Sequence, residues 1–142
     1  MPPGVRAAVI GGVRNIMTDK RAGQRLRVLI AEDSPRMRKS LSDACACLPH
    51  LEVVGEVADG FDTIEAVRDL KPDVLTLDIH MPRINGLDVL RIMQREKCEC
   101  VVIVLTALVD DFYREKCQEL KADYFFDKIT ELDRFLETMK AI

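Results

Sequence analysis

The chain has 142 residues, of which 48% are hydrophobic and 32% charged, with a net charge of −3 at pH 7. This length suits one domain with a full core, and the charge balance gives no sign of a general nucleic-acid-binding protein. No apolar run approaches the roughly 20 residues that a membrane-spanning helix needs, so we expect no membrane insertion.

Residues 1–25 differ from the rest of the chain in charge and pattern. They hold five basic residues and one acidic residue, a net charge of +4, which leaves −7 for residues 26–142. They are rich in Gly, Pro and Arg and lack a periodic apolar face, so we expect a basic N-terminal extension that adds little to the core. The sequence leaves open whether this extension is ordered. The domain itself is predicted over residues 26–142.

From residue 26 onward, short apolar runs alternate with stretches of helical periodicity. The runs predict strands over residues 27–31, 53–58, 74–77, 101–105 and 124–126. The other stretches predict helices over about 35–48, 62–70, 86–95, 110–120 and from 131 onward, with N-caps at Ser34, Asp62, Asn85 and Thr130. Apolar strands that are each followed by a helix indicate an α/β fold, a parallel sheet covered on both faces.

Polar residues stand where four of these strands end. Glu32 and Asp33 follow the first strand, Asp78 the third, Thr106 the fourth and Lys128 the fifth. Because the carboxyl ends of parallel strands meet at one edge of a sheet, we expect these side chains to converge on one pocket.

The residue types in this pocket predict its chemistry. Three carboxylates repel one another and need a cation, and oxygen ligands without His or Cys favour Mg²⁺. A hydroxyl and an ammonium can hold phosphoryl oxygens, while a carboxylate can accept the phosphoryl group itself. Considered one at a time, these residues have simpler explanations. Glu32 and Asp33 are typical of a solvated helix start, Thr106 is typical of an N-cap, and Lys128 is typical of an exposed surface residue. Their agreement in position favours the site.

The sequences VLIAEDS, DVLTLDIHMPRINGLDVL, VVIVLTA and ADYFFDK contain these residues. With them, residues 27–141 resemble the receiver domain of two-component response regulators. The resemblance implies a doubly wound, flavodoxin-like, five-stranded parallel sheet in the order 2-1-3-4-5. It also implies that Asp78 becomes a 4-aspartylphosphate, with phosphate received from a sensor histidine kinase or a phosphotransfer protein. The Mg²⁺ ligands implied are Glu32, Asp33, Asp78 and the backbone carbonyl of His80.

The same resemblance assigns the remaining residues of the pocket. Thr106 and Lys128 contact the phosphoryl group, and Thr106 forms a switch pair with Phe125, where the family often has tyrosine. The family also often has proline after the lysine. Here Ile129 follows Lys128, and a non-proline cis bond costs roughly 2.5–4 kcal/mol. This cost favours a trans bond and a differently shaped turn, but the sequence leaves the conformation of the bond open.

We therefore expect a phosphorylation-controlled switch of protein–protein interactions. No effector domain follows Ile142, so the expectation is a stand-alone receiver, monomeric or transiently dimeric, without DNA binding and without catalysis beyond self-phosphotransfer and slow autodephosphorylation. Its output surface is expected on the last two helices and the strand between them. An unphosphorylated docking module is the alternative. A phosphatase of the haloacid dehalogenase type is disfavoured because His80 stands where that family needs a second aspartate.

The cysteines give no sign of a disulfide framework. There are five of them, an odd number in a domain large enough to fold without such bonds. Cys98 and Cys100 have no His or second Cys pair at a metal-ligand spacing. We expect core or surface thiols and a cytoplasmic location.

Overall fold

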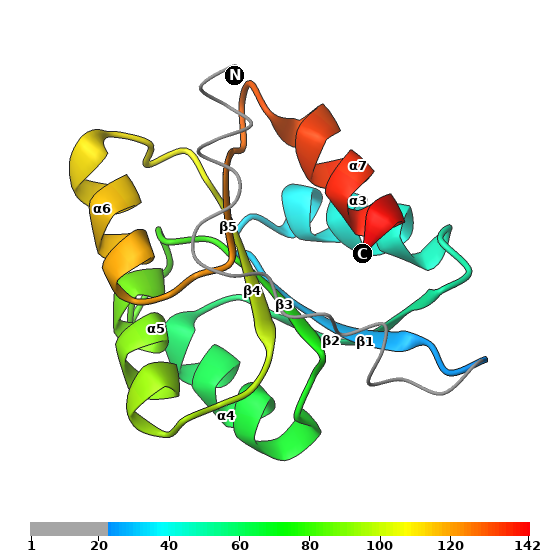
Figure 1. Cartoon of the computed structure of the whole chain (residues 1–142), viewed down its shortest axis with the longest axis horizontal. Helices are drawn as coiled ribbons and strands as arrows, with labels where there is room; N and C mark the ends of the chain where they lie inside the picture. The colour runs from blue at the N-terminus through cyan, green and yellow to red at the C-terminus, as the bar shows by residue number, and fades with distance from the viewer. Residues whose placement is uncertain (1–22) are drawn as a thin grey trace.

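A computed structural model describes residues 23–142, so most of the predicted N-terminal extension lies outside the described residues (Figure 1). The strands are β1 (Leu26–Ala31), β2 (Leu51–Val57), β3 (Val74–Leu77), β4 (Val101–Thr106) and β5 (Tyr124–Asp127). They form one parallel sheet in the order β2-β1-β3-β4-β5, which confirms the expected fold. The helices of this region are α3 (Pro35–Ala46), α4 (Gly60–Leu70), α5 (Gly86–Arg95), α6 (Asp111–Glu119) and α7 (Leu132–Ala141).

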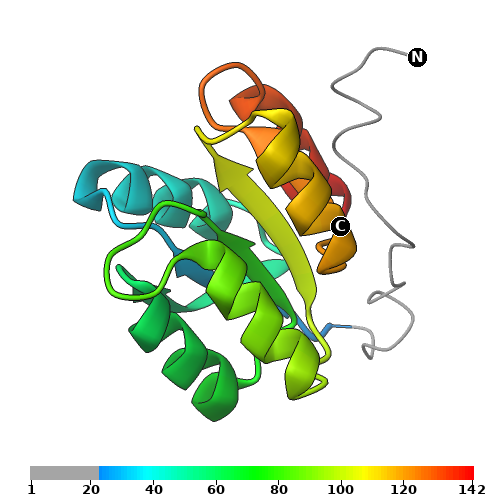
Figure 2. The same cartoon turned by 90° about the vertical axis from the view of Figure 1, so that its left-hand side faces the viewer.

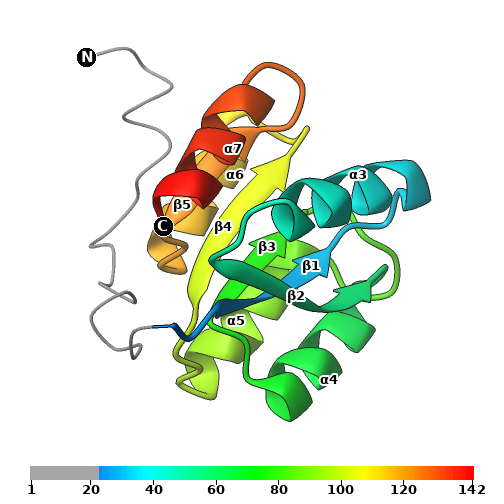
Figure 3. The same cartoon turned by 90° about the vertical axis from the view of Figure 1, so that its right-hand side faces the viewer.

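Helices cover both faces of the sheet. Helices α4, α5 and α6 lie on the face toward the viewer in Figure 2, and α3 and α7 lie on the face toward the viewer in Figure 3. Side chains alternate between these faces along each strand. Val28 packs with Phe135 and Met139 on the α3 and α7 side, whereas Leu29 packs with Val67 on the other side. Because both faces are covered, the central strands β3 and β4 are buried throughout, as their largely apolar sequences predicted.

Two of the four predicted helix caps are confirmed. Ser34 Oγ accepts a hydrogen bond from Met37 N at 3.3 Å, and Asn85 Oδ1 accepts one from Asp88 N at 3.0 Å. The cap predicted at Asp62 is wrong, because α4 begins earlier and Asp59 is its N-cap. Asp59 Oδ1 accepts from the backbone N of Asp62 at 2.8 Å, so Asp62 lies in the first turn instead.

The cap predicted at Thr130 is also wrong. Helix α7 starts after Glu131, and no side chain caps its first turn. Instead of capping the helix, the carboxylates of Asp127 and Glu131 accept hydrogen bonds from backbone donors in the turn after β5. Asp127 Oδ1 accepts from Ile129 N at 2.8 Å, and Glu131 Oε1 accepts from Asp127 N at 3.0 Å. These bonds, together with one between the Thr130 side chain and Asp127, order the turn from within.

Two aspartates fix the amino ends of neighbouring strands. Asp73, directly before β3, accepts a hydrogen bond on Oδ2 from Arg27 N at 2.8 Å. Asp123, directly before β5, accepts one on Oδ2 from Val102 N, also at 2.8 Å. Each carboxylate satisfies a backbone donor at the start of the adjacent strand and so helps to set the register of the sheet.

Residues 23–142 also bear on the expectations for the cysteines and for membrane insertion. All five cysteines are free thiols, three of them buried. None of the helices in this region combines the length and the apolar character needed to cross a membrane.

Candidate functional site

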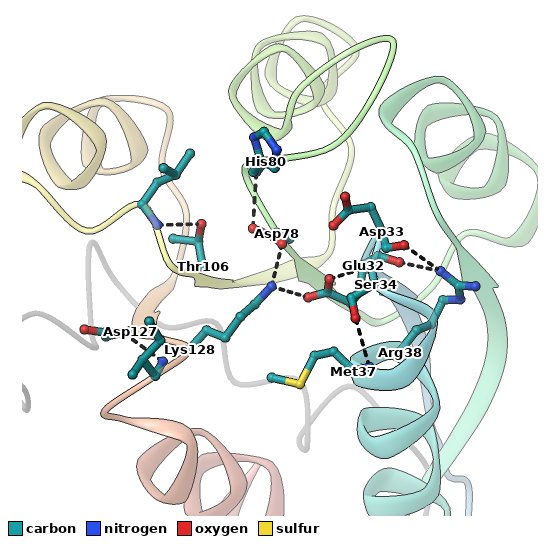
Figure 4. Close-up of polar contacts among 12 residues, drawn as sticks. Glu32, Asp33, Ser34, Met37, Arg38, Asp78, His80, Thr106, Asp127 and Lys128 are labelled. Carbon is teal, nitrogen blue, oxygen red and sulfur yellow. Dashed lines mark hydrogen bonds and ion pairs between the residues drawn. The ribbon is translucent and has the colours of Figure 1, made fainter.

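The polar residues at the strand ends lie together at the carboxyl edge of the sheet (Figure 4). Carboxylate oxygens of Glu32, Asp33 and Asp78 lie within 4.8 Å of one another. Thr106 ends β4 beside them, and the side chain of Lys128 reaches in from the residue after β5. The structure thus brings together all five side chains that sequence reasoning placed at this edge.

Lys128 joins two of the three acids. Its Nζ lies 2.5 Å from Glu32 Oε1 and 2.6 Å from Asp78 Oδ2. Only 1% of Glu32 and 3% of Asp78 is exposed, so the ammonium compensates charges that solvent barely reaches. Lys128 therefore supplies a positive charge to a site that gathers three carboxylates.

Burial and ion pairing act against each other on these groups. Burial raises the pKa of Glu32, and its hydrogen bonds with Lys128 and Ser34 only partly oppose this, so the pKa stays above its ordinary value. Burial lowers the pKa of Lys128, but hydrogen bonds to Asp78 and Glu32 outweigh it and leave that pKa raised. Lys128 is therefore a firmly charged group at neutral pH.

The backbone after β3 positions Asp78. Its N donates to Ala31 O at 3.1 Å, which extends the pairing with β1 by one residue, and its Oδ1 accepts from His80 N at 3.2 Å. Gly86 N then closes the loop on Ile79 O at 2.8 Å. A Cβ on Gly86 would lie 2.5 Å from Asp78 O, so the glycine of the D-x-x-M-P-x-x-x-G sequence is needed for this close approach.

Glu32 is held from three sides. Its N donates to Val57 O at 3.0 Å, and its Oε2 accepts from Ser34 N at 2.9 Å. Its backbone O accepts from Arg38 Nη1 at 2.7 Å, which ties the end of β1 to α3. Sequence reasoning missed Arg38, because nothing in the helical pattern indicates that a basic side chain turns back toward the strand. Asp33 is half-buried and its carboxylate points toward the cluster (Figure 4).

Thr106 and Phe125 lie on adjacent strands. Thr106 is fully buried, and its Oγ1 accepts from Leu108 N at 3.2 Å in the following loop. The Phe125 ring is 1% exposed, so it packs inward. The guanidinium carbon of Arg114, on α6, lies 4.8 Å from the centre of this ring. Arg114 also donates from Nε to Val109 O at 2.9 Å, a second connection that the sequence did not indicate.

His80 lies at the rim of the site. It is exposed, and its imidazole points away from Lys128 in Figure 4. On the other side of the site, the bond between Lys128 and Ile129, which the sequence left open, is trans, since residues 23–142 contain no cis peptide bond.

The donor set fits a hard divalent cation. Glu32, Asp33 and Asp78 offer carboxylate oxygens at short mutual distances, and neither sulfur nor imidazole stands among the clustered ligand atoms. Mg²⁺ prefers such oxygen ligands and takes few of them from protein, which leaves room for water and phosphate oxygens.

Comparison with known proteins agrees with this geometry. The family model for the response regulator receiver domain matches residues 28–140. The protein-glutamate methylesterase/protein-glutamine glutaminase of Pyrococcus abyssi is 47% identical over 89 residues, which are 63% of this chain and 24% of that protein. The chain thus spans about a quarter of the length of such curated relatives.

Solved structures give the same result. The response regulator domain of Thermotoga maritima CheB matches with a TM-score of 0.73 and 28% identity, over 84% of this chain and 98% of that domain. The CheX–CheY–BeF3–Mg²⁺ complex of Borrelia burgdorferi contains a chain that matches with a TM-score of 0.70 and 27% identity, over 87% of this chain and 93% of that one. The chain described here therefore belongs to the response regulator receiver domains of two-component signalling.

Proposed function

We propose that this receiver accepts a phosphoryl group on Asp78 in a Mg²⁺-dependent reaction and thereby switches its protein–protein interactions. The observation that supports this most directly is the position of Lys128, whose ammonium lies between the carboxylates of Glu32 and Asp78. A cation at that point can follow the charge as it moves from carboxylate to phosphoryl oxygens.

The residues around Asp78 have separate parts in this proposal. Glu32, Asp33 and Asp78, with the His80 carbonyl, hold Mg²⁺, which when bound neutralises phosphoryl charge. A carboxylate oxygen of Asp78 attacks the phosphorus of a phosphohistidine on a sensor kinase or phosphotransfer protein. The new O–P bond forms as the P–N bond breaks, and the histidine nitrogen leaves with the bonding pair. Lys128 holds the transferred group by its oxygens.

The signal leaves the site through Thr106 and Phe125. In the resting structure Thr106 Oγ1 accepts from Leu108 N, so a move of the hydroxyl to a phosphoryl oxygen costs this loop one hydrogen bond. The loop can then rearrange, and the Phe125 ring can take up the space that the hydroxyl leaves. The ring is already buried, and because Phe125 has no hydroxyl it can shift further toward Thr106 without leaving a polar group unpaired. The partner is proposed to read the change on α6, β5 and α7.

The test is phosphorylation by a small phosphodonor such as acetyl phosphate with Mg²⁺, followed by intact-mass measurement. We expect one acid-labile phosphoryl group on the wild type and on Asp88→Asn, whose carboxylate lies on the surface of α5. We expect none on Asp78→Asn, or on the wild type in EDTA. Modification of Asp78→Asn to the wild-type extent would overturn the assignment. Sustained turnover of the phosphodonor, with little modified protein, would favour a phosphatase instead.

The relatives favour a second, narrower proposal. The relative from Pyrococcus abyssi and one from Pyrococcus horikoshii are both named protein-glutamate methylesterase/protein-glutamine glutaminase. We infer that this receiver controls an activity of that kind, either alone or within a longer chain. Adding the phosphorylated receiver to the methylesterase portion of the Pyrococcus abyssi relative should change the rate of methyl ester hydrolysis. Asp78→Asn, treated identically, should leave that rate unchanged.

A further inference from the structure

A cluster of four residues, which we name the Arg83 clamp, joins the loop between β3 and α5 to the start of α4. It consists of Arg83, in the loop, and Asp59, Phe61 and Asp62. Arg83 donates from Nε and Nη2 to the two oxygens of Asp59 at 3.1 and 3.2 Å, and from Nη2 to Asp62 Oδ1 at 3.1 Å. Its guanidinium carbon lies 4.8 Å from the centre of the Phe61 ring.

The backbones beneath the Arg83 clamp are in close contact. Gly60 N donates to Pro82 O across a long 3.4 Å contact, and a Cβ on Gly60 would lie 1.8 Å from Ile84 O. Only glycine lets the first turn of α4 approach the loop this closely. Arg83 itself has a φ of 66°, in the left-handed region that side chains other than Gly, Asn and Asp rarely adopt. The side-chain contacts of Arg83 therefore hold a backbone conformation that the residue would not choose alone.

The same loop begins at Asp78 and contains His80. At its far end it is fixed by Gly86, whose N donates to Ile79 O. In its middle, the side chains of the Arg83 clamp attach it to α4. His80 and Pro82 lie between Ile79, which Gly86 holds, and Arg83, and the Pro82 carbonyl is one of the groups that contact α4. A shift of Arg83 away from α4 therefore changes the path of the backbone that leads back to His80.

We propose that Arg83 is a positioning residue for Mg²⁺: by holding the loop against α4, it places the backbone carbonyl of His80 where the ion needs it. This rests on the proposed function, which puts Mg²⁺ at Glu32, Asp33 and Asp78. Arg83 touches none of these three acids in the structure and acts through the loop alone. Preorganised ligands raise affinity because the cost of ordering them is met before binding.

The charge of Arg83 and its positioning role should have opposite effects on Mg²⁺ binding, so an experiment can distinguish them. Replacing an arginine with glutamine removes a positive charge, which by Coulomb attraction alone strengthens the binding of a cation. A loss of positioning weakens it. Arg91 supplies a matched control, since it also pairs with an aspartate, at 2.8 Å, and has a similarly exposed side chain, but it lies on α5 outside the loop.

The experiment is a calorimetric Mg²⁺ titration of the full chain, without phosphodonor, for the wild type, Arg83→Gln and Arg91→Gln. We expect the dissociation constant of Arg83→Gln to rise about three- to tenfold, as for the loss of partly exposed ion pairs and one cation–π contact. Arg91→Gln should stay within about a factor of two, or bind slightly tighter, because only its charge effect remains.

Asp59→Asn tests the contact from the other side. Asparagine keeps the N-cap of α4 but weakens the pairing with Arg83. If both residues act through one contact, Asp59→Asn should weaken Mg²⁺ binding in the wild type and have little further effect in Arg83→Gln. Far-ultraviolet circular dichroism of each variant checks that the fold is retained.

The outcomes separate the two proposals. If the wild type takes up no Mg²⁺, the proposed function fails. If the wild type binds Mg²⁺ and Arg83→Gln binds it equally well or better, the positioning role of Arg83 is overturned and the proposed function stands. A lower melting temperature of Arg83→Gln with unchanged Mg²⁺ affinity likewise overturns it, since that is the result of a purely structural role.

Discussion

The ammonium of Lys128, one residue beyond β5, lies 2.6 Å from Oδ2 of Asp78, one residue beyond β3. The same nitrogen lies 2.5 Å from Glu32 Oε1, so one side chain links the ends of three strands. Two of those strands, β1 and β3, are adjacent, and β4 separates β3 from β5. Lys128 therefore spans the carboxyl edge of the sheet as well as pairing with its acids.

This position predicts a large stability effect for Lys128. Lys128→Met leaves two nearly buried carboxylates without their cation, and we expect unfolding in EDTA to become easier by about 2–4 kcal/mol. Mg²⁺ should recover part of this loss, because it compensates the same charges. Urea denaturation with and without Mg²⁺ measures both effects. Lys140→Met removes an exposed pair with Glu137 and should cost less than about 1 kcal/mol. Equal losses in the two variants would contradict this account.

Thr106→Ala should separate phosphorylation from signalling. The variant retains Asp78 and should be phosphorylated, but it lacks the hydroxyl that leaves Leu108 N for the phosphoryl group. We expect the ring resonances of Phe125 to shift on phosphorylation of the wild type and to shift much less in Thr106→Ala. Phe126 is an internal control, since it is equally buried but packs on the opposite face of the sheet. Identical Phe125 shifts in both proteins would rule out this pathway.

His80 is expected to tune the lifetime of the aspartyl-phosphate. Its exposed imidazole stands at the mouth of the site. The neutral ring can orient a water molecule, whereas the charged ring can pair with phosphoryl oxygens and shield them. Decay of the phosphorylated protein should differ several-fold between wild type and His80→Asn, with a dependence on pH between about 5.5 and 8. Superimposable decay curves would make His80 a bystander.

Asp59 predicts a specific acid sensitivity. The hydrogen bond from Asp62 N, together with Arg83, lowers the pKa of this carboxyl below its ordinary value of 3.8. A lowered pKa means that the charged form favours the folded state, so this stabilisation is complete above that value and is lost as pH falls through the lower, folded pKa. Melting temperatures measured from neutral pH to below 3.8 should fall less steeply for Asp59→Asn than for the wild type. Parallel curves would mean that Asp59 contributes no such linkage.

Gly86→Ala should destabilise the domain although Gly86 opens a helix. Alanine normally favours a helix over glycine by roughly 0.5–1 kcal/mol. Here its Cβ would meet Asp78 O at 2.5 Å, and the displaced backbone should cost about 1–3 kcal/mol. Denaturant unfolding gives the sign directly, and a more stable variant would show that the loop yields without cost.

The sequence predicted the strands well where they are mostly apolar. The range predicted for the third strand, 74–77, is the observed β3. The second strand was predicted to start at residue 53 but starts at Leu51. Leu51 is buried and pairs with Leu26, but the charged Glu52 separates it from the apolar run that predicted the strand. An apolar pattern alone does not predict which residues of an edge strand pair with the neighbouring strand.

Caps and inter-element ion pairs were less predictable for a physical reason. Asp59 and Asp62 have the same side-chain chemistry, and which one caps α4 depends on the close packing of Gly60 on Ile84. The contacts of Arg83 and Arg114 likewise join elements that only the folded chain brings together. The acidic residues at the strand ends could be predicted because parallel topology alone brings them together. The pairing of Lys128 with both Glu32 and Asp78 could be seen only in the folded structure.

The amino ends of the strands, held by Asp73 and Asp123, provide a fixed position against which the motion of other elements can be measured. The two aspartates fix these ends by side-chain bonds, at the end of the sheet opposite Asp78. Cys47, the C-cap of α3, lies toward that end and is exposed, whereas burial raises the pKa of Cys45 to about 11 and that of Cys117 to about 12. Cys100 is buried as well, and burial also raises the pKa of the half-buried Cys98, so a spin label or fluorophore should attach preferentially to Cys47. Distances from this label to a second probe on α6 would then report the displacement of α6 alone.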